Sequence, residues 1–370
     1  MRNRLSLKNK ICFFNTTPFW GGGEKLHLEY ALEFKKLNYP ICVVAKKDAP
    51  FYKKSVEEKL EVETFTINNL SFLNSVKFYN LINYFKQRHI HTLFISASPD
   101  LKIAALAAKK AGVTNIVYLR GLAVSIKNNP LNKILLTQIV THIIANSEET
   151  KRKILENFKN TELENKVKVI YHGIDLEIFD KNYIAQQPIY TKKEGEIIFG
   201  NAGRLTKQKG QFYLIDIAKK LQEQQLNFKI LIAGTGEEEQ ELKQLIKTNK
   251  LEEKVLLLGF VENIEGFMKS LDVFVLTSIW EGFGYVIVEA MAAKKSVVAF
   301  NITSNPEIIA ANKTGFLIPL PDINKFSEQL KILAQDAALR IKLGINGRKR
   351  VEEKFQLKLI IKEIEAYLFS

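Results

Sequence analysis

The chain has 370 residues, of which 46% are hydrophobic and 25% are charged, and its formal net charge is +14 at pH 7. This length predicts two domains, and this composition excludes collagen-like, disordered and coiled-coil proteins. No stretch approaches the ~20 consecutive apolar residues of a membrane-spanning helix, and the apolar run after the basic residues 1–10 is too short for a signal peptide.

The first half of the chain alternates short apolar runs with amphipathic stretches. Cys12 and Cys42 lie in two of the apolar runs, which indicates buried thiols and a reducing, cytoplasmic compartment. A polar stretch without periodicity at residues 180–195 predicts a linker. We predict strands at residues 11–15, 40–45, 92–96, 115–119, 142–145 and 167–171, and helices at residues 24–37 and 102–111.

The same alternation restarts after the linker. Strands rich in valine, isoleucine and leucine that alternate with helices favour parallel sheets covered on both faces. Ligands bind such sheets outside the carboxyl ends of the strands. We predict strands at residues 196–201, 228–233, 255–258, 272–277, 296–300 and 315–318, and helices at residues 211–224, 237–247 and 286–293.

The predicted fold is therefore α/β, with two Rossmann-like domains whose parallel sheets face each other across a cleft. We place the first domain, with its linker, at residues 1–190 and the second at residues 191–350. Residues 351–370 form a C-terminal helix that we expect to pack back on the first domain.

Positive charge is concentrated in the first half. Residues 1–190 contain 28 basic and 17 acidic residues, and residues 64–147 contain nine basic residues and a single acid, Asp100. Such a field attracts phosphorylated substrates, anionic lipid or nucleic acid. Because no recognition motif or basic-aromatic interleaving is present, we expect no nucleic acid partner. We expect a weak peripheral contact with the anionic inner face of the membrane, to which each basic residue contributes roughly 1 kcal/mol.

Two loops between a predicted strand and a predicted helix have the features of phosphate-binding loops. In Trp20-Gly21-Gly22-Gly23-Glu24, glycines let backbone N–H groups approach an anion at a helix N-terminus, although the spacing matches neither a Walker loop nor a dinucleotide fingerprint. In the loop from residue 203 to residue 210, Arg204 and Lys209 lie five positions apart, where a guanidinium and an ammonium would bind two phosphates.

A third loop carries two glutamates. Glu281 precedes a predicted helix and Glu289 lies one to two turns inside it. Gly282 and Gly284 between them expose backbone amides at the start of the helix, which favours an anion there.

These motifs together resemble glycosyltransferase family four, the retaining, nucleotide-sugar-dependent enzymes with two Rossmann-like domains, or GT-B fold. The resemblance covers nearly the whole chain and is densest from about residue 198 to residue 318. The matching motifs run in family order: Gly22-Gly23-Glu24, Ala145-Asn146-Ser147-Glu148, Tyr171-His172-Gly173-Ile174-Asp175, Gly203-Arg204-Leu205 with Lys209-Gly210, Ile232-Ala233-Gly234-Thr235-Gly236, Glu281 through Glu289, and Asn305-Pro306-Glu307-Ile308.

The resemblance implies a site for a nucleotide-diphosphate sugar in the second domain. Arg204 and Lys209 would hold the diphosphate and neutralise the leaving nucleotide, and Glu281 would contact hydroxyls of the transferred sugar, which makes these three the catalytic residues. Glu289 would accept hydrogen bonds from the ribose. The remaining donor contacts are implied for the amides of Phe283, Gly284 and Tyr285, for Gly259 and Phe260 near the nucleobase, and for Gly22 and Gly23, which would close over the diphosphate from the opposite domain.

The resemblance also implies an acceptor site in the first domain, for an envelope glycan or a lipid-linked acceptor of the lipopolysaccharide, capsule or exopolysaccharide type. Glu24 and Arg120 are its candidates; Arg120 lies where many members carry a histidine. Many members also have asparagine where His172 stands, so the role of His172 stays open.

The predicted chemistry needs no cofactor and no metal. Charge develops on the departing diphosphate, and positioned cations and amides stabilise it most in the transition state. The five histidines are scattered, and none lies in an acid cluster. The family's retaining reaction implies front-face attack without a protein nucleophile. Two alternatives are a sugar-nucleotide hydrolase or epimerase of the same fold, and a non-catalytic scaffold that binds nucleotide-sugar.

Overall fold

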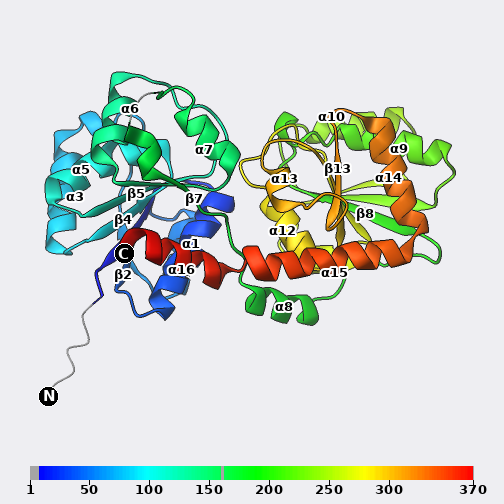
Figure 1. The fold of residues 1–370 in the computed structure, drawn as a ribbon, viewed down its shortest axis with the longest axis horizontal. Coiled ribbons are helices and arrows are strands. Elements are labelled where there is room, and N and C mark those ends of the chain that lie inside the picture. The colour runs from blue at the N-terminus through cyan, green and yellow to red at the C-terminus, as the bar shows by residue number, and fades with distance from the viewer. Residues whose placement is uncertain (1–7, 160–161, 370) are drawn as a thin grey trace, which may run out of the picture. The chain divides into compact units, whose positions relative to one another are not determined.

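The computed structural model describes residues 8–159 and 162–369, which form two compact units. The first unit contains the described residues up to His172 together with those from Ile360 onward, and the second contains Gly173 to Leu359. Each unit is a parallel β-sheet with helices on both faces (Figure 1). The expected α/β fold with two Rossmann-like domains is confirmed.

The first unit has a seven-stranded sheet in the order β3-β2-β1-β4-β5-β6-β7, and every pairing is parallel. Its strands are β1 (Ile11–Asn15), β2 (Ile41–Ala45), β3 (Glu61–Thr64), β4 (Thr92–Ile95), β5 (Asn115–Arg120), β6 (His142–Ala145) and β7 (Val167–Val169). Its helices are α1 (Gly22–Lys36), α2 (Pro50–Glu57), η1 (Ser71–Leu73), α3 (Ser75–Gln87), α4 (Ser98–Asp100), η2 (Leu101–Ala105), α5 (Leu106–Ala111), α6 (Pro130–Ile134), η3 (Leu135–Ile139), α7 (Glu148–Leu155) and η4 (Glu162–Lys166).

The second unit has a six-stranded parallel sheet in the order β10-β9-β8-β11-β12-β13. Its strands are β8 (Ile197–Ala202), β9 (Phe228–Ala233), β10 (Val255–Gly259), β11 (Val273–Leu276), β12 (Ser296–Phe300) and β13 (Gly315–Ile318). Its helices are α8 (Leu176–Ala185), η5 (Lys207–Lys209), α9 (Tyr213–Glu223), α10 (Glu239–Thr248), α11 (Ile264–Ser270), α12 (Tyr285–Ala292), α13 (Asn305–Ile308), α14 (Ile323–Gln335) and α15 (Ala337–Lys354).

The central strands of both sheets are buried on both faces, as their valine- and isoleucine-rich sequences predict, whereas the edge strands β3 and β10 are mostly half-buried. The side chains of β1 and β12 are all buried, and phenylalanines from neighbouring strands pack face to face, as Phe13 does on Phe94 at 4.8 Å between ring centroids. In each sheet the loops at the carboxyl ends of the strands leave this apolar core, which places polar side chains there.

The last helix, α16 (Leu357–Phe369), begins in the second unit, and from Ile360 onward its residues belong to the first. Its Ile361 and Ile364 are buried, and the backbone oxygen of Leu368 accepts a hydrogen bond from Asn115 of β5. The Tyr39 hydroxyl donates to Glu365 at 2.7 Å.

Three expectations need correction. Residues 180–195 are not structureless throughout, because α8 continues to Ala185; Asp175 caps its N-terminus through the backbone N–H groups of Glu177 and Ile178. Residues 351–370 are not one helix, since α15 ends at Lys354 and α16 starts at Leu357. The contact boundary falls after His172 instead of after residue 190. Residues 1–7 and Ser370 of the predicted segments lie outside the described residues.

Candidate functional site

The loops after β8 and β9 pack edge to edge at the carboxyl end of the second sheet. The backbone N–H of Leu205 donates to Thr235 at 2.9 Å. Gly234 has φ +148°, and a Cβ there would lie 1.9 Å from the carbonyl oxygen of Gly203. Only glycine permits this approach, so the backbone itself fixes the start of the loop that carries Arg204.

The end of this loop is fixed in the same way. Gly210 closes η5 in the left-handed conformation, with φ +59°, and a Cβ would lie 2.3 Å from the carbonyl oxygen of Thr277. The Gln211 side chain donates to the Arg204 carbonyl oxygen at 3.0 Å. Among the described residues, the exposed guanidinium of Arg204 has no ion-pair partner. The loop is therefore rigid while its cation faces solvent.

Lys209 and Glu281 form an ion pair at this edge of the sheet. The Lys209 Nζ lies 2.7 Å from Glu281 Oε1 and 2.9 Å from Oε2. The two side chains are 18% and 6% exposed, so water screens the pair little. The Ser278 hydroxyl donates to Glu281 Oε1 at 2.6 Å, which leaves the carboxylate engaged as an acceptor by two side chains.

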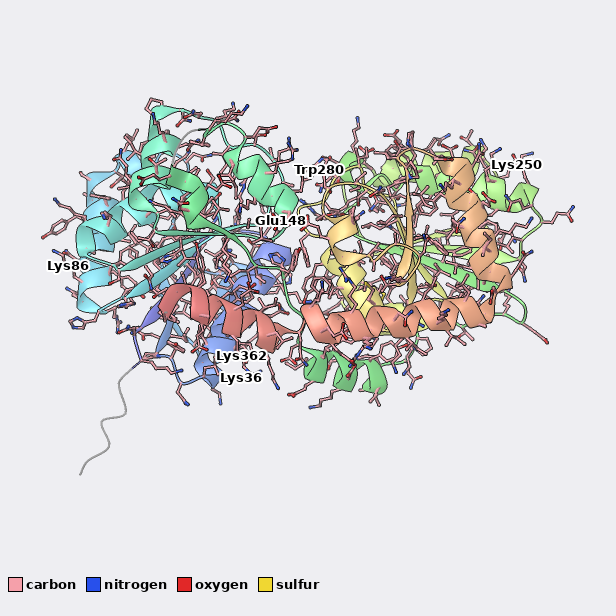
Figure 2. The ribbon with its side chains drawn as sticks, in the orientation of Figure 1. Lys36, Lys86, Glu148, Lys250, Trp280 and Lys362 are labelled. Carbon is pink, nitrogen blue, oxygen red and sulfur yellow. The ribbon has the colours of Figure 1, made fainter. Side chains whose placement is uncertain are left out.

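The loop that carries Glu281 is tied to its neighbours on both sides. On one side, Ile279 N–H donates to the Gln208 oxygen and the Gln208 side chain donates to the Trp280 oxygen. Figure 2 shows Trp280 on this loop between β11 and α12. On the other side, the backbone N–H of Glu281 donates to the Thr303 hydroxyl at 2.9 Å.

Sequence reasoning missed Ser278 and Thr303. Ser278 lies three residues before Glu281, a spacing that suits a hydroxyl in a tight loop, and this is the signal that was available. Thr303 gave none, because it follows a different strand, β12. Its φ of +37° is rare for a threonine, and such backbone strain occurs at functional sites.

The N-terminus of α12 continues the site. Gly284 is the N-cap, and no side chain caps the helix. A Cβ on Gly284 would lie 2.8 Å from Cδ1 at the end of the Ile287 side chain, and Gly284 follows the buried Phe283. Glu289, the fifth residue of α12, is 7% exposed. The first turn with Tyr285 therefore offers backbone partial positive charge at the edge of the sheet.

Gly259 and Phe260 lie at the carboxyl end of β10. Gly259 has φ +70°, and its oxygen accepts from Gly234 N–H at 2.7 Å, which joins this strand end to the loop after β9. Phe260 is 72% exposed. An aromatic ring in solvent at a sheet edge offers a stacking surface for a planar ligand.

In the first unit, Gly22 and Gly23 begin α1 and are exposed, and a Cβ at either would meet open space. Glu24 follows them and accepts a hydrogen bond from Asn15 at 3.2 Å. These three predicted residues lie at the carboxyl end of β1, in a different unit from the other donor candidates.

Beside them lies Asp100, which is 1% exposed. It accepts hydrogen bonds from the backbone N–H of Thr16 at 2.8 Å and from the Thr16 hydroxyl at 2.5 Å. Burial raises the pKa of Asp100 to about 6, against the lowering effect of the Thr16 hydrogen bonds. The carboxyl group thus holds the chain where it turns from β1 towards α1.

Arg120 ends β5, and His172 follows β7. The guanidinium of Arg120 donates from Nη1 to the Tyr118 hydroxyl at 3.3 Å and from Nη2 to the Val124 oxygen at 2.9 Å. Its Nε is enclosed and has no acceptor within the described ranges. Burial lowers the pKa of His172 to about 4, so this imidazole is neutral at pH 7.

The structure thus brings together Lys209 and Glu281, and it sets the loops of Arg204, Gly259 and Gly284 along one sheet edge. Within the described ranges, no group of three or more histidine, cysteine, aspartate or glutamate side chains could hold a metal ion. A search of the described helices finds none with the length and hydrophobicity needed to span a bilayer.

Comparisons with known proteins agree with this arrangement. A family profile described as "Glycosyl transferases group 1" matches residues 183–350, and one described as "Glycosyltransferase Family 4" matches residues 20–178. The chain is 28% identical to the UDP-Gal:alpha-D-GlcNAc-diphosphoundecaprenol alpha-1,3-galactosyltransferase of Escherichia coli, over 95% of this chain and 94% of that protein. It is 33% identical to the capsular polysaccharide biosynthesis glycosyltransferase CapM of Staphylococcus aureus, over 61% of this chain and 60% of that protein.

Among solved structures, the Anabaena protein HepE, crystallised with UDP and glucose, superimposes with a TM-score of 0.83 over 98% of this chain and all of that one. At 22% identity this likeness shows the fold, GT-B. Two family profiles that together span most of the described residues, and a relative matched nearly end to end, give the same assignment. The chain therefore belongs to the glycosyltransferases of the family-four type.

Proposed function

We propose that this glycosyltransferase uses a nucleotide-diphosphate sugar as donor and binds it at the carboxyl edge of the second sheet. The observation that supports this most is the enclosed Lys209–Glu281 pair, flanked by the solvent-facing Arg204 on a loop fixed by glycines. The E. coli relative is named for UDP-Gal, and HepE was crystallised with UDP and glucose.

In this proposal Arg204 and Lys209 hold the two phosphates. As the bond between sugar and diphosphate breaks, negative charge grows on the departing oxygen, and cations that are already positioned stabilise it without reorganisation. Glu281 anchors the Lys209 ammonium and presents an oxygen to hydroxyls of the transferred sugar. No metal is needed for this neutralisation.

The other donor contacts follow from position. The amides of Phe283 and Gly284 at the start of α12 face the phosphate and sugar, and Glu289 accepts from the ribose hydroxyls. The third predicted amide, that of Tyr285, already donates to the Phe283 oxygen at 2.6 Å and would have to exchange this bond to reach the donor. The exposed ring of Phe260, with Gly259, lies against the base. Gly22 and Gly23 leave room for the diphosphate to approach the N-terminus of α1.

We further propose that transfer proceeds with retention of the anomeric configuration, by front-face attack without a protein nucleophile. Glu281 accepts from Lys209 and Ser278, whereas hydrolysis by a carboxylate pair requires an acid that donates a proton. This environment gives no support to a hydrolase. The exposed, unpaired Arg204 likewise gives no support to a binding scaffold that has lost its catalytic cation.

For the acceptor we propose a lipid-linked or envelope glycan, used at the cytoplasmic face of the inner membrane, with which the protein makes a weak peripheral contact. The names of the two relatives describe a diphosphoundecaprenol substrate and capsular polysaccharide synthesis. The nine basic residues and single acid at residues 64–147 suit such an anionic partner.

The test begins with thermal shifts of the whole protein against UDP, GDP, ADP and their sugars, since a ligand that binds only the folded state raises the melting temperature. Donor cleavage is then measured with the stabilising sugar nucleotide, with and without EDTA, and NMR of the product gives the anomer. Nucleotide-dependent cleavage that survives EDTA and keeps the configuration is expected. An inverted product would refute retention, and loss of activity in EDTA would refute metal independence.

The two candidate cations differ in how much their removal is expected to destabilise the fold. Lys209→Ala removes the partner of an enclosed carboxylate and costs about 3–5 kcal/mol of stability, so its inactivity alone is ambiguous. Arg204 has no ion-pair partner among the described residues, so Arg204→Ala is expected to leave the fold intact. Wild-type cleavage by Arg204→Ala would exclude its contact with the diphosphate.

A further inference from the structure

A second candidate site lies wholly inside the first unit, at the carboxyl ends of β4 and β5. It is a pocket of about 780 Å³, a volume typical of ligand sites. Its walls come from the turn before η1, the start of η2, the end of β5, and the segment through α6 into η3. Figure 1 shows α6 at one extremity of this unit.

The pocket is cationic, with no carboxylate in its lining. Its charged side chains are Lys102, Arg120 and Lys127. Lys102 donates to the neutral Asn69 at 3.3 Å, and its Nζ lies 6.0 Å from the centroid of the Phe72 ring. Among the described residues, Arg120 donates only to the Tyr118 hydroxyl and the Val124 oxygen. None of the three forms an ion pair with a described residue. Three cations in one concavity, none with an ion-pair partner among the described residues, create a positive field that favours an anionic ligand.

The rest of the lining is largely apolar. Leu70, Phe72 and Leu131 face the pocket together with buried residues of η2 and η3. The apolar surface continues outside it, since Leu70, Leu73, Val76 and Tyr79 are each more than 60% exposed. Val76 and Tyr79 lie three residues apart on α3 and share a face. A free inorganic anion would leave all this apolar surface unused.

We infer that this pocket binds a diphosphate that carries a hydrocarbon chain. The diphosphate lies between the side chains of Lys102, Arg120 and Lys127, which all line the pocket. The first part of the chain lies against Phe72 and Leu131 and leaves past Leu70. This inference rests on the proposed function, in which the ligand is the lipid anchor of the acceptor.

The probe is farnesyl diphosphate, added to the whole protein below its micelle concentration and followed by calorimetry. Farnesol and inorganic diphosphate are the two comparison ligands, because each carries half of the proposed determinant. Farnesyl diphosphate is expected to bind at least about tenfold more tightly than either. Equal affinity for inorganic diphosphate would show a simple phosphate site and overturn the lipid part of the inference.

Two charge-matched variants locate the binding. The double variant Lys102→Gln and Lys127→Gln removes two cations from the pocket, and Lys109→Gln with Lys110→Gln removes two exposed cations of α5 from the same unit. The first is expected to weaken farnesyl diphosphate about tenfold or more, and the second less than about twofold. Equal weakening would mean a general field effect and would overturn the site.

A neutral variant tests the apolar half. Leu70→Asn removes an exposed apolar side chain from the rim without changing charge, so the fold is not at risk. It is expected to weaken farnesyl diphosphate about threefold and to leave inorganic diphosphate unchanged. An unchanged affinity for farnesyl diphosphate would contradict the proposed path of the chain.

The same samples separate this inference from the proposed function. Thermal shift with nucleoside diphosphates, measured in the Lys102→Gln and Lys127→Gln double variant to weaken binding of their diphosphate in the pocket, reports the second unit, whose candidate residues none of these substitutions touches. A nucleotide response without farnesyl diphosphate binding overturns the pocket and leaves the proposed function standing. Farnesyl diphosphate binding without any nucleotide response overturns the proposed function and, with it, the ligand's role as an acceptor.

Discussion

The strand-end loops of the two units are built by different means. In the second unit, backbone contacts fix them: glycines at 210 and 234 allow approaches that no other residue permits, and the Lys209–Glu281 pair joins the loops of β8 and β11. In the first unit, a Cβ on Gly22 or Gly23 would meet open space, and a pocket is lined by cations that form no ion pair with a described residue. A fixed backbone suits one invariant ligand group such as a diphosphate, whereas side chains on open loops suit a ligand that varies.

The largest expected difference between the units concerns catalysis. Arg204→Ala is expected to lower the rate of donor cleavage about 10²–10³-fold, the effect typical of losing one transition-state donor, with an unchanged melting temperature. Arg120→Ala is expected to lower transfer to the acceptor while cleavage of the donor by water persists. Cleavage and transfer are measured in parallel, with Lys207→Ala, an exposed cation of the same loop as Arg204, as control. Equal loss of both reactions in Arg120→Ala would contradict the assignment of donor cleavage to the second unit and acceptor binding to the first.

Next in size is the backbone effect. Gly210→Ala is expected to cost about 3 kcal/mol of stability or more, because the new Cβ meets the Thr277 oxygen and the φ is left-handed. Gly112 is the matched control, because it has φ +85° with nothing within 4 Å, so Gly112→Ala is expected to cost about 1 kcal/mol. Urea unfolding follows the second unit, which holds Gly210, through Trp280 in a Trp20→Phe background, and the first unit, which holds Gly112, through Trp20 in a Trp280→Phe background. Equal losses of stability for Gly210→Ala and Gly112→Ala would show that the protein adjusts to the new Cβ at position 210 without cost, which would contradict the prediction.

The third prediction concerns the buried Asp100 of the first unit. Because folding raises its pKa from 3.8 to about 6, its protonated form favours the folded state, and this stability is lost as pH rises from about 4 to about 6. The loss amounts to about 3 kcal/mol. Asp100→Asn does not titrate, so the stability of the wild type relative to this variant is expected to fall over that range. Unfolding of the first unit is followed by the fluorescence of Trp20 in a Trp280→Phe background. If the stability of the wild type and of Asp100→Asn changed with pH in the same way, the titration could not be assigned to Asp100.

The smallest expected effect concerns the two glycines that begin α1. Gly22→Ala and Gly23→Ala are each expected to raise stability by about 0.5 kcal/mol, because alanine favours the helix and meets open space. Both are nevertheless expected to lower activity, since a methyl group would fill the space that the diphosphate approaches. Stability is measured by urea unfolding and activity by donor cleavage. Full activity would exclude these two residues from the donor site.

The sequence predicts the sheets well because their strands are nearly continuous runs of valine, isoleucine and leucine. The one strand it misses, β3, reads Glu61-Val62-Glu63-Thr64 and lies at the sheet edge with none of its residues buried, so its composition resembles a loop. Helix α8 is missed for a similar reason. It lies at the start of a polar stretch, and Asp175, the residue that caps it, lies before that stretch.

The site is predictable only in part. Each loop is visible as a glycine-containing stretch after a strand, but the pairing of Lys209 with Glu281 joins residues 72 positions apart. It depends on β11 lying beside β8, a strand order that periodicity does not give. The pocket of the first unit is still harder to predict. Residues near 70, 102, 120 and 131 lie in separate loops and helices, and they meet only when the segments that join them have folded onto the sheet.

Helix α16 has a consequence for the order of folding. The first unit lacks part of its core until Ile360, Ile361 and Ile364 are in place, and these are translated only after every residue of the second unit. On the ribosome, the second unit can therefore fold before the first unit is complete. This reverses the usual order, in which the N-terminal domain folds first. A premature stop just before Ile360 would release a folded second unit joined to a first unit whose core lacks the buried isoleucines of α16.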